Sequence, residues 1–169
     1  MMKRNLLVLV SIFLFFGCAR VYFANPQPLK GTTVKSFVKD IRGIYADSIL
    51  TVEIQADELI VNGDRYRLSK DEPSEAEVLV KYYNDFYFAS FSDSAYFLVF
   101  MGKFYENKLA VYMLNADQRS VDILNRFVKV DTPDAAQKSY LIDPSKKEFS
   151  AVIESGLFDV VSVMTKVEE

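Results

Sequence analysis

The chain has no histidine, no tryptophan and only one cysteine in 169 residues. The missing histidine excludes histidine-based triads, histidine acid–base catalysis and histidine metal sites. A single cysteine can form neither an intramolecular disulfide nor a thiolate metal cage. We therefore expect no catalytic residues, no metal and no cofactor, and a domain that its apolar core alone holds together.

Clustered positive charge is also missing. The chain carries 20 Lys and Arg against 23 Asp and Glu, a net charge of −3, and no basic run follows Arg4. Phosphate contacts supply most of the affinity for nucleic acids, so we predict no nucleic-acid partner. The absence of tryptophan also disfavours stacking on sugars.

The N-terminus has the pattern of a secretion signal. Lys3 and Arg4 precede an apolar run at 6–16, and Gly17 supplies the small residue expected before a cleavage point. The run is shorter than the roughly 20 residues that span a bilayer. We therefore predict that residues 1–17 are a cleaved signal peptide.

The stretch Leu14-Phe15-Phe16-Gly17-Cys18 resembles the lipobox of bacterial lipoproteins. The resemblance implies cleavage between Gly17 and Cys18 and attachment of a diacylglycerol to the Cys18 thiol. Acylation would also protect a lone thiol in an oxidising compartment. The alternative is cleavage elsewhere, for example after Ala19, with Cys18 in the discarded piece.

In overall plan the chain resembles the small lipoproteins of Gram-negative envelopes. That resemblance implies a lipid anchor in a membrane of the cell envelope, expected to be the periplasmic face of the outer membrane. It favours a non-enzymatic accessory or structural module with an envelope protein as partner. Pro26 and Pro28 favour extended backbone, so we read 18–42 as the lipidated N-terminus and tether, and 43–169 as one globular domain.

The body of the chain predicts strands. Half of the residues are apolar and 14 % are aromatic, and residues 50–54 alternate between apolar and polar. Asn62-Gly63 within 58–68 is a strong hairpin signal, with Leu59 and Tyr66 on one face. Further apolar runs separated by turn residues lie at 78–83, 86–91, 96–104 and 109–114.

The fold class is therefore mainly β with some α. We expect an antiparallel meander of about six to eight strands in a strongly curved or partly closed sheet. Two short helices are expected near the C-terminus, one at 117–125 and one that starts at Asp143-Pro144. Pro144 is expected early in the first turn of the second helix, and Ser145 and Glu148 have capping-box spacing. Gly156 would end the second helix, and 160–167 would form the last strand.

Aromatic residues crowd the stretch 82–112. Phe86-Tyr87-Phe88 places aromatic rings on both faces of one strand, so one face cannot be ordinary solvent-facing surface. One interpretation is a ligand cavity or an exposed apolar face. The other interpretation, which burial alone favours, is that helices or a second sheet cover that face of the strand. The band comprises Tyr82, Tyr83, Phe86, Tyr87, Phe88, Phe91, Tyr96, Phe97, Phe100, Phe104, Tyr105 and Tyr112.

Gly43-Ile44-Tyr45, followed by a meander, is similar to the start of the first strand in lipocalin-like barrels. The resemblance implies an alternative function, the binding of a lipid or another apolar small molecule in the mouth of a barrel.

Other polar residues give weaker signals. The pairs Asp57/Glu58, Asp71/Glu72 and Glu75/Glu77 lie in predicted turns and match no calcium loop, so we interpret them as solvated charges. Ser36 and Lys39 have S-x-x-K spacing, but neither an S-D-N nor a K-T-G partner follows. The chain also has no phosphate-binding glycine loop.

Overall fold

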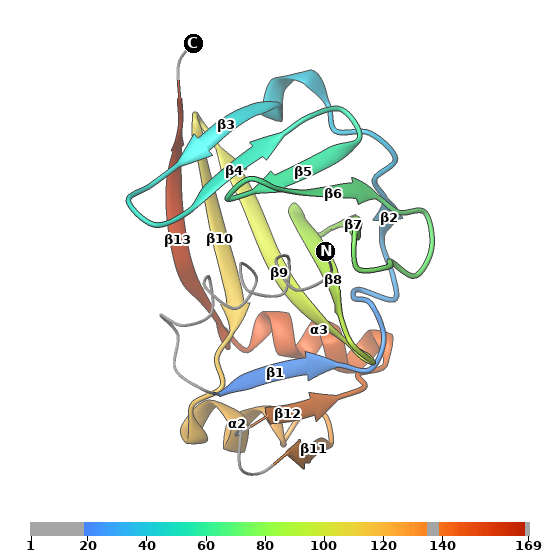
Figure 1. The fold of residues 1–169 in the computed structure, drawn as a ribbon. Coiled ribbons are helices and arrows are strands. Elements are labelled where there is room, and N and C mark those ends of the chain that lie inside the picture. Colours follow the sequence, from blue (N-terminus) through green and yellow to red (C-terminus); the bar gives the residue numbers. More distant parts are fainter. Residues whose placement is uncertain (1–18, 135–138, 168–169) are drawn as a thin grey trace.

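The computed structural model describes residues 19–134 and 139–167. These residues form a mainly β fold with two α-helices, and nine of their strands close into a barrel (Figure 1). The mainly β class and the strong curvature agree with the prediction. Closure is complete because β9 pairs with both β8 and β10, and β10 pairs with β13.

The barrel strands differ in length. The longer ones are β7 (Glu77–Tyr83), β8 (Phe86–Asp93), β9 (Tyr96–Tyr105), β10 (Lys108–Leu114) and β13 (Phe158–Lys166). The shorter ones are β3 (Gly43–Ala46), β4 (Thr51–Ile54), β5 (Glu58–Val61) and β6 (Asp64–Leu68). The longer strands therefore extend past the shorter ones and carry elements outside the barrel.

Tight turns with positive φ produce the meander. Asn62 (φ 49°) and Gly63 (φ 93°) make the predicted turn between β5 and β6, and Leu59 faces Tyr66 across that hairpin. One barrel pairing is not antiparallel: β6 and β7 run in the same direction, with Arg67 opposite Glu77. The polar segment 69–76 makes the return that a parallel pair requires.

A small second layer lies against the outer face of the longer strands (Figure 1). It contains β1 (Arg20–Phe23), β11 (Val130–Asp134), β12 (Ser139–Ile142), α2 (Gln118–Leu124) and α3 (Lys146–Glu154). β1 pairs with β12 in parallel and joins the barrel where Phe23 lies opposite Phe97 on β9.

The segment expected to be a tether is part of the folded domain from Arg20 onward. Phe23 is fully buried, and Gln27, also fully buried, exchanges hydrogen bonds with Ser90: its amide donates to Ser90 Oγ, which donates to the Gln27 carbonyl oxygen (both 3.1 Å). The expected boundary at residue 43 therefore comes too late. The remainder of the segment forms β2 (Thr32–Thr33), which pairs with β7, and the short 3₁₀ helix η1 (Lys39–Ile41).

Helix α3 has the predicted cap. Ser145 is its N-cap and accepts a hydrogen bond from the Glu148 amide, while the Glu148 carboxylate accepts one from the Ser145 amide (2.7 Å). Pro144 precedes the helix and does not lie in its first turn. Phe149 and Val152 are buried against the barrel, and Gly156 (φ 73°) follows the helix end.

The described part of the chain contains no helix that is long and apolar enough to cross a bilayer. Gly17 and Cys18, at the predicted cleavage and lipidation site, lie outside the described residues.

Candidate functional site

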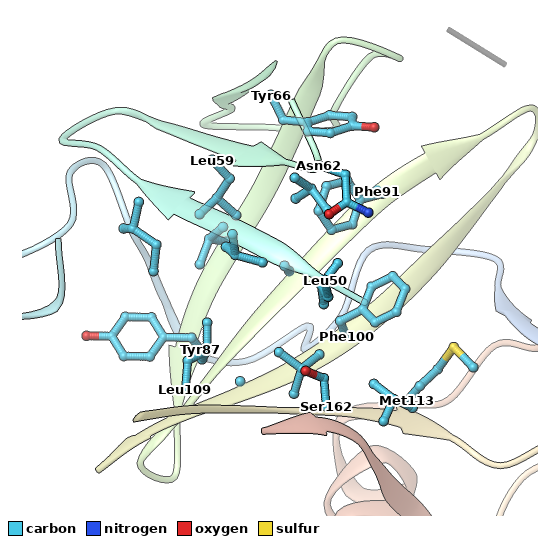
Figure 2. A pocket seen from close by; sticks show the side chains of 18 of the residues that line it. Leu50, Leu59, Asn62, Tyr66, Tyr87, Phe91, Phe100, Leu109, Met113 and Ser162 are labelled. Atoms are coloured by element: carbon cyan, nitrogen blue, oxygen red, sulfur yellow. The ribbon is translucent and has the colours of Figure 1, made fainter. Parts of the chain in front are cut away.

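The inner faces of the barrel strands enclose an apolar cavity of about 380 Å³. Alternation along each strand creates it, because every second side chain of a strand points to the same face. On β9, Leu98, Phe100 and Phe104 point inward, whereas Met101 belongs to the core on the other side. Figure 2 shows side chains from strands on opposite sides of the barrel converging on one space.

The aromatic band divides between the two faces of the sheet, so both of its interpretations hold in part. Tyr87, Phe91, Phe100 and Phe104 line the cavity, and the rings of Tyr87 and Phe104 meet edge to face at 5.4 Å. On the outer face, Phe88 packs against Phe149 of α3 with the ring centroids 5.5 Å apart. Helix α3 therefore covers one face of β8 while the opposite face remains available to a ligand.

One end of the barrel is closed by the segment before β3. Phe37 is buried among the cavity-lining residues, and its amide donates to the carbonyl oxygen of Ala56 (2.8 Å) at the β4–β5 turn. The Arg42 guanidinium donates to the Phe37 carbonyl oxygen and holds the segment in place.

Tyr45 of the Gly43-Ile44-Tyr45 motif lies at this closed end. It is buried, donates from its hydroxyl group to the Ile41 carbonyl oxygen (3.0 Å) and packs against Phe104. The Lys166 ammonium from the last strand lies over its ring, 5.8 Å from the centroid. The motif therefore closes the barrel end and does not line the cavity.

The carboxylate, amide and hydroxyl side chains of Asp47, Asn62 and Ser162 lie at the other end of the cavity, which we call the mouth. Asp47 in the β3–β4 loop binds Ser162 of β13: Ser162 Oγ donates to Asp47 Oδ2 (2.6 Å). The backbone amides of Ile49 and Leu50 both donate to Asp47 Oδ1 (2.7 Å each). Partial burial raises the pKa of Asp47, but these hydrogen bonds outweigh it and leave the pKa below the ordinary value.

Asn62, in the β5–β6 turn, lies at the same end of the cavity. Its side-chain oxygen accepts from the Thr51 amide (2.8 Å), which leaves the amide nitrogen as a neutral donor. Burial, and to a smaller extent the nearby Asp64 carboxylate, raises the pKa of the Tyr66 phenol to about 12. The Tyr87 pKa is raised by burial as well. At neutral pH both phenols are therefore uncharged.

The structure brings none of the predicted charged candidates into the cavity. Glu58 pairs with Arg65 (2.6 Å), and Glu77 accepts hydrogen bonds from Ser74. Ser36 accepts a long hydrogen bond (3.4 Å) from Arg42. In the described residues, no three His, Cys, Asp or Glu side chains form a cluster that could hold a metal ion.

Asp47 and Ser162 were not singled out in the sequence. Their pairing joins residues 115 positions apart, and no local pattern encodes such a contact. The available signals were weak: Asp47-Ser48 is a turn-forming pair, and Ser162 interrupts an apolar run in the last strand.

Comparisons of the chain with protein-family models, with curated proteins and with solved structures found no match.

Proposed function

We propose that the protein binds a small apolar molecule in its barrel. This proposal rests on the cavity of about 380 Å³, which is lined mainly by aliphatic and aromatic side chains. Protein interiors are close-packed and seldom keep voids larger than a water molecule. Ligand sites typically measure about 300–1,000 Å³ and combine apolar walls with a few polar groups, as this cavity does.

The order of elements supports a lipocalin-like role. A glycine–spacer–aromatic motif begins the first barrel strand and a meander follows. The motif closes one end of the barrel, while Asp47, Asn62 and Ser162 lie at the other. The polar groups at the mouth are engaged in holding the loop, with Asp47 bonded to two amides and a hydroxyl group. We therefore propose binding without catalysis.

The test is to purify the tagged full chain from its producing cells and to identify extractable small molecules by mass spectrometry. Ala89 lines the cavity, so Ala89→Leu fills part of it, whereas Thr165→Leu adds the same side chain at an exposed site on β13. We expect a retained apolar compound with the wild type and with Thr165→Leu, and much less with Ala89→Leu. Equal recovery from all three would contradict the proposal.

We also propose that Cys18 anchors the protein to the cell envelope, on the periplasmic face of the outer membrane. The support is the lipobox-like stretch at 14–18. Because β1 begins at Arg20, only Ala19 would separate the lipid from the folded domain, which would therefore lie close to the membrane surface. Metabolic labelling with an alkyne fatty acid tests this: the wild type should be labelled and Cys18→Ser should not.

The accessory role in a membrane assembly, which the sequence favours, is the second candidate, and its support is the same lipoprotein-like plan. The purification that looks for a ligand also tests it, because a stoichiometric protein partner in the eluate would favour the assembly role.

A further inference from the structure

The charge on the described residues that line the cavity is negative. Among the described residues that line it, Asp47 is the only Asp, Glu, Lys or Arg, and it lies at the mouth. We propose that the ligand is a single-chain amphiphile whose head group donates hydrogen bonds, an amine or an alcohol, and that Asp47 and Ser162 select it over a carboxylate. This inference rests on the proposed function and specifies its ligand class.

The hydrogen bonds at Asp47 leave room for such a head group. Oδ1 already accepts from the amides of Ile49 and Leu50, whereas Oδ2 accepts from Ser162 Oγ alone among the described residues. A carboxylate oxygen can accept two hydrogen bonds, so Oδ2 has one acceptor site left. Ser162 Oγ uses its only proton on Asp47 and retains acceptor capacity. The pair therefore presents acceptors to an incoming head group.

A carboxylate head is poorly matched to this mouth. Its charge would face the ionised Asp47, and no Lys or Arg of the described lining is present to compensate. Asn62 offers a neutral amide donor, which does not offset repulsion between two charges. Deeper placement would bring the carboxylate charge into a mainly apolar lining whose described residues include no cation, which is costly.

The size of the cavity favours one chain. Its volume of about 380 Å³ lies at the small end of the range for ligand sites, which suits a single alkyl chain better than a two-chain lipid. The mouth groups then meet the head while Tyr87, Phe91 and Phe104 surround the chain.

The experiment uses three diazirine probes that share one dodecyl chain and end in an amine, a hydroxyl or a carboxylate. The full chain is photolabelled in a detergent-free cell extract, and labelled cavity-lining peptides are quantified by mass spectrometry. We expect half-maximal labelling by the amine and the alcohol at concentrations about tenfold or more below that of the carboxylate. Added salt should reduce the advantage of the amine.

Asp47→Asn keeps an acceptor oxygen for the loop and removes the charge, so it should bring the amine and carboxylate probes within about twofold of each other. The matched control is Asp159→Asn, on the same strand as Ser162 but bonded to Asn115 outside the cavity lining. It should preserve the wild-type ratio.

Equal labelling by all three probes, or a ratio unchanged by both salt and Asp47→Asn, would overturn this inference and leave the proposed binding function standing. Absence of cavity labelling by any probe would overturn the binding function itself. If Asp47→Asn fails to fold, the salt dependence of the wild type still decides.

Discussion

At the scale of single residues, Tyr66 is a phenol whose protonation the fold alters strongly. Burial, with a contribution from Asp64, raises its pKa to about 12, against about 10 for an ordinary tyrosine. The fold therefore favours the neutral phenol. The stability that this pKa shift contributes to the folded state is complete below pH 10 and is lost as the pH rises from about 10 towards 12.

Replacing Tyr66 by phenylalanine tests this shift. Spectrophotometric titration of the wild type should show a tyrosine ionising near pH 12 that is missing from Tyr66→Phe. The variant should also lose less stability than the wild type between pH 10 and 12. A Tyr66 that ionises near pH 10 would contradict the burial that the structure shows.

Two glycines in the barrel should respond in opposite ways to alanine. Gly43 has φ +135°, and a Cβ there would lie 2.6 Å from Lys166 Cε. Gly43→Ala should cost about 1–3 kcal/mol, because both the backbone and the neighbouring side chain must adjust. Gly102 has room, with its nearest contact at 3.5 Å from Leu109. Gly102→Ala should therefore be neutral or stabilising by up to about 1 kcal/mol, as urea denaturation would measure.

At the scale of elements, the cap of α3 is a local device with a measurable contribution. Ser145→Ala removes the side chain that accepts from Glu148 and should lower the free energy of unfolding by about 1 kcal/mol. Lys147→Ala, an exposed site in the same turn, is the control and should change it little. A loss of the same size in both variants would mean that the cap contributes nothing specific.

Local signals such as this cap are what made several elements predictable. The Asn62-Gly63 hairpin and the Ser145–Glu148 box depend on residues a few positions apart, and both are found where expected. The parallel pairing of β6 with β7 was not predictable, because segment 69–76 is an ordinary polar loop in sequence. The place of β1 in the second layer was not predictable either, because β1 pairs with residues 139–142, far along the chain.

At the scale of the whole molecule, the N-terminal segment should be required for stability. Phe23 is fully buried and its ring lies 6.0 Å from that of Phe149. Phe23→Ala should cost about 3–5 kcal/mol, a large part of the stability of a domain of this size. Val38→Ala, in the same segment at a site that is 57 % exposed, should cost little. If both variants unfold at the wild-type urea concentration, β1 is not part of the cooperative fold.

The candidate site was also predictable from the sequence only in part. The aromatic residues that line it were visible in sequence as a band with rings on both faces of a strand. The division of that band between the cavity and the α3 interface depends on barrel closure and on which face α3 covers, for example through Phe88 and Phe149. The mouth pair Asp47–Ser162 exists only because closure places β13 beside the β3–β4 loop.

The most direct test of the central claim is titration of the protein with a neutral, environment-sensitive apolar dye such as N-phenylnaphthylamine. Gly102→Leu fills the cavity from β9, and Thr165→Leu serves as the control on the outer surface. We predict saturable binding near one dye per chain to the wild type and to Thr165→Leu, with affinity at least about tenfold weaker in Gly102→Leu. Equal binding to folded Gly102→Leu and wild type would contradict a ligand site inside the barrel.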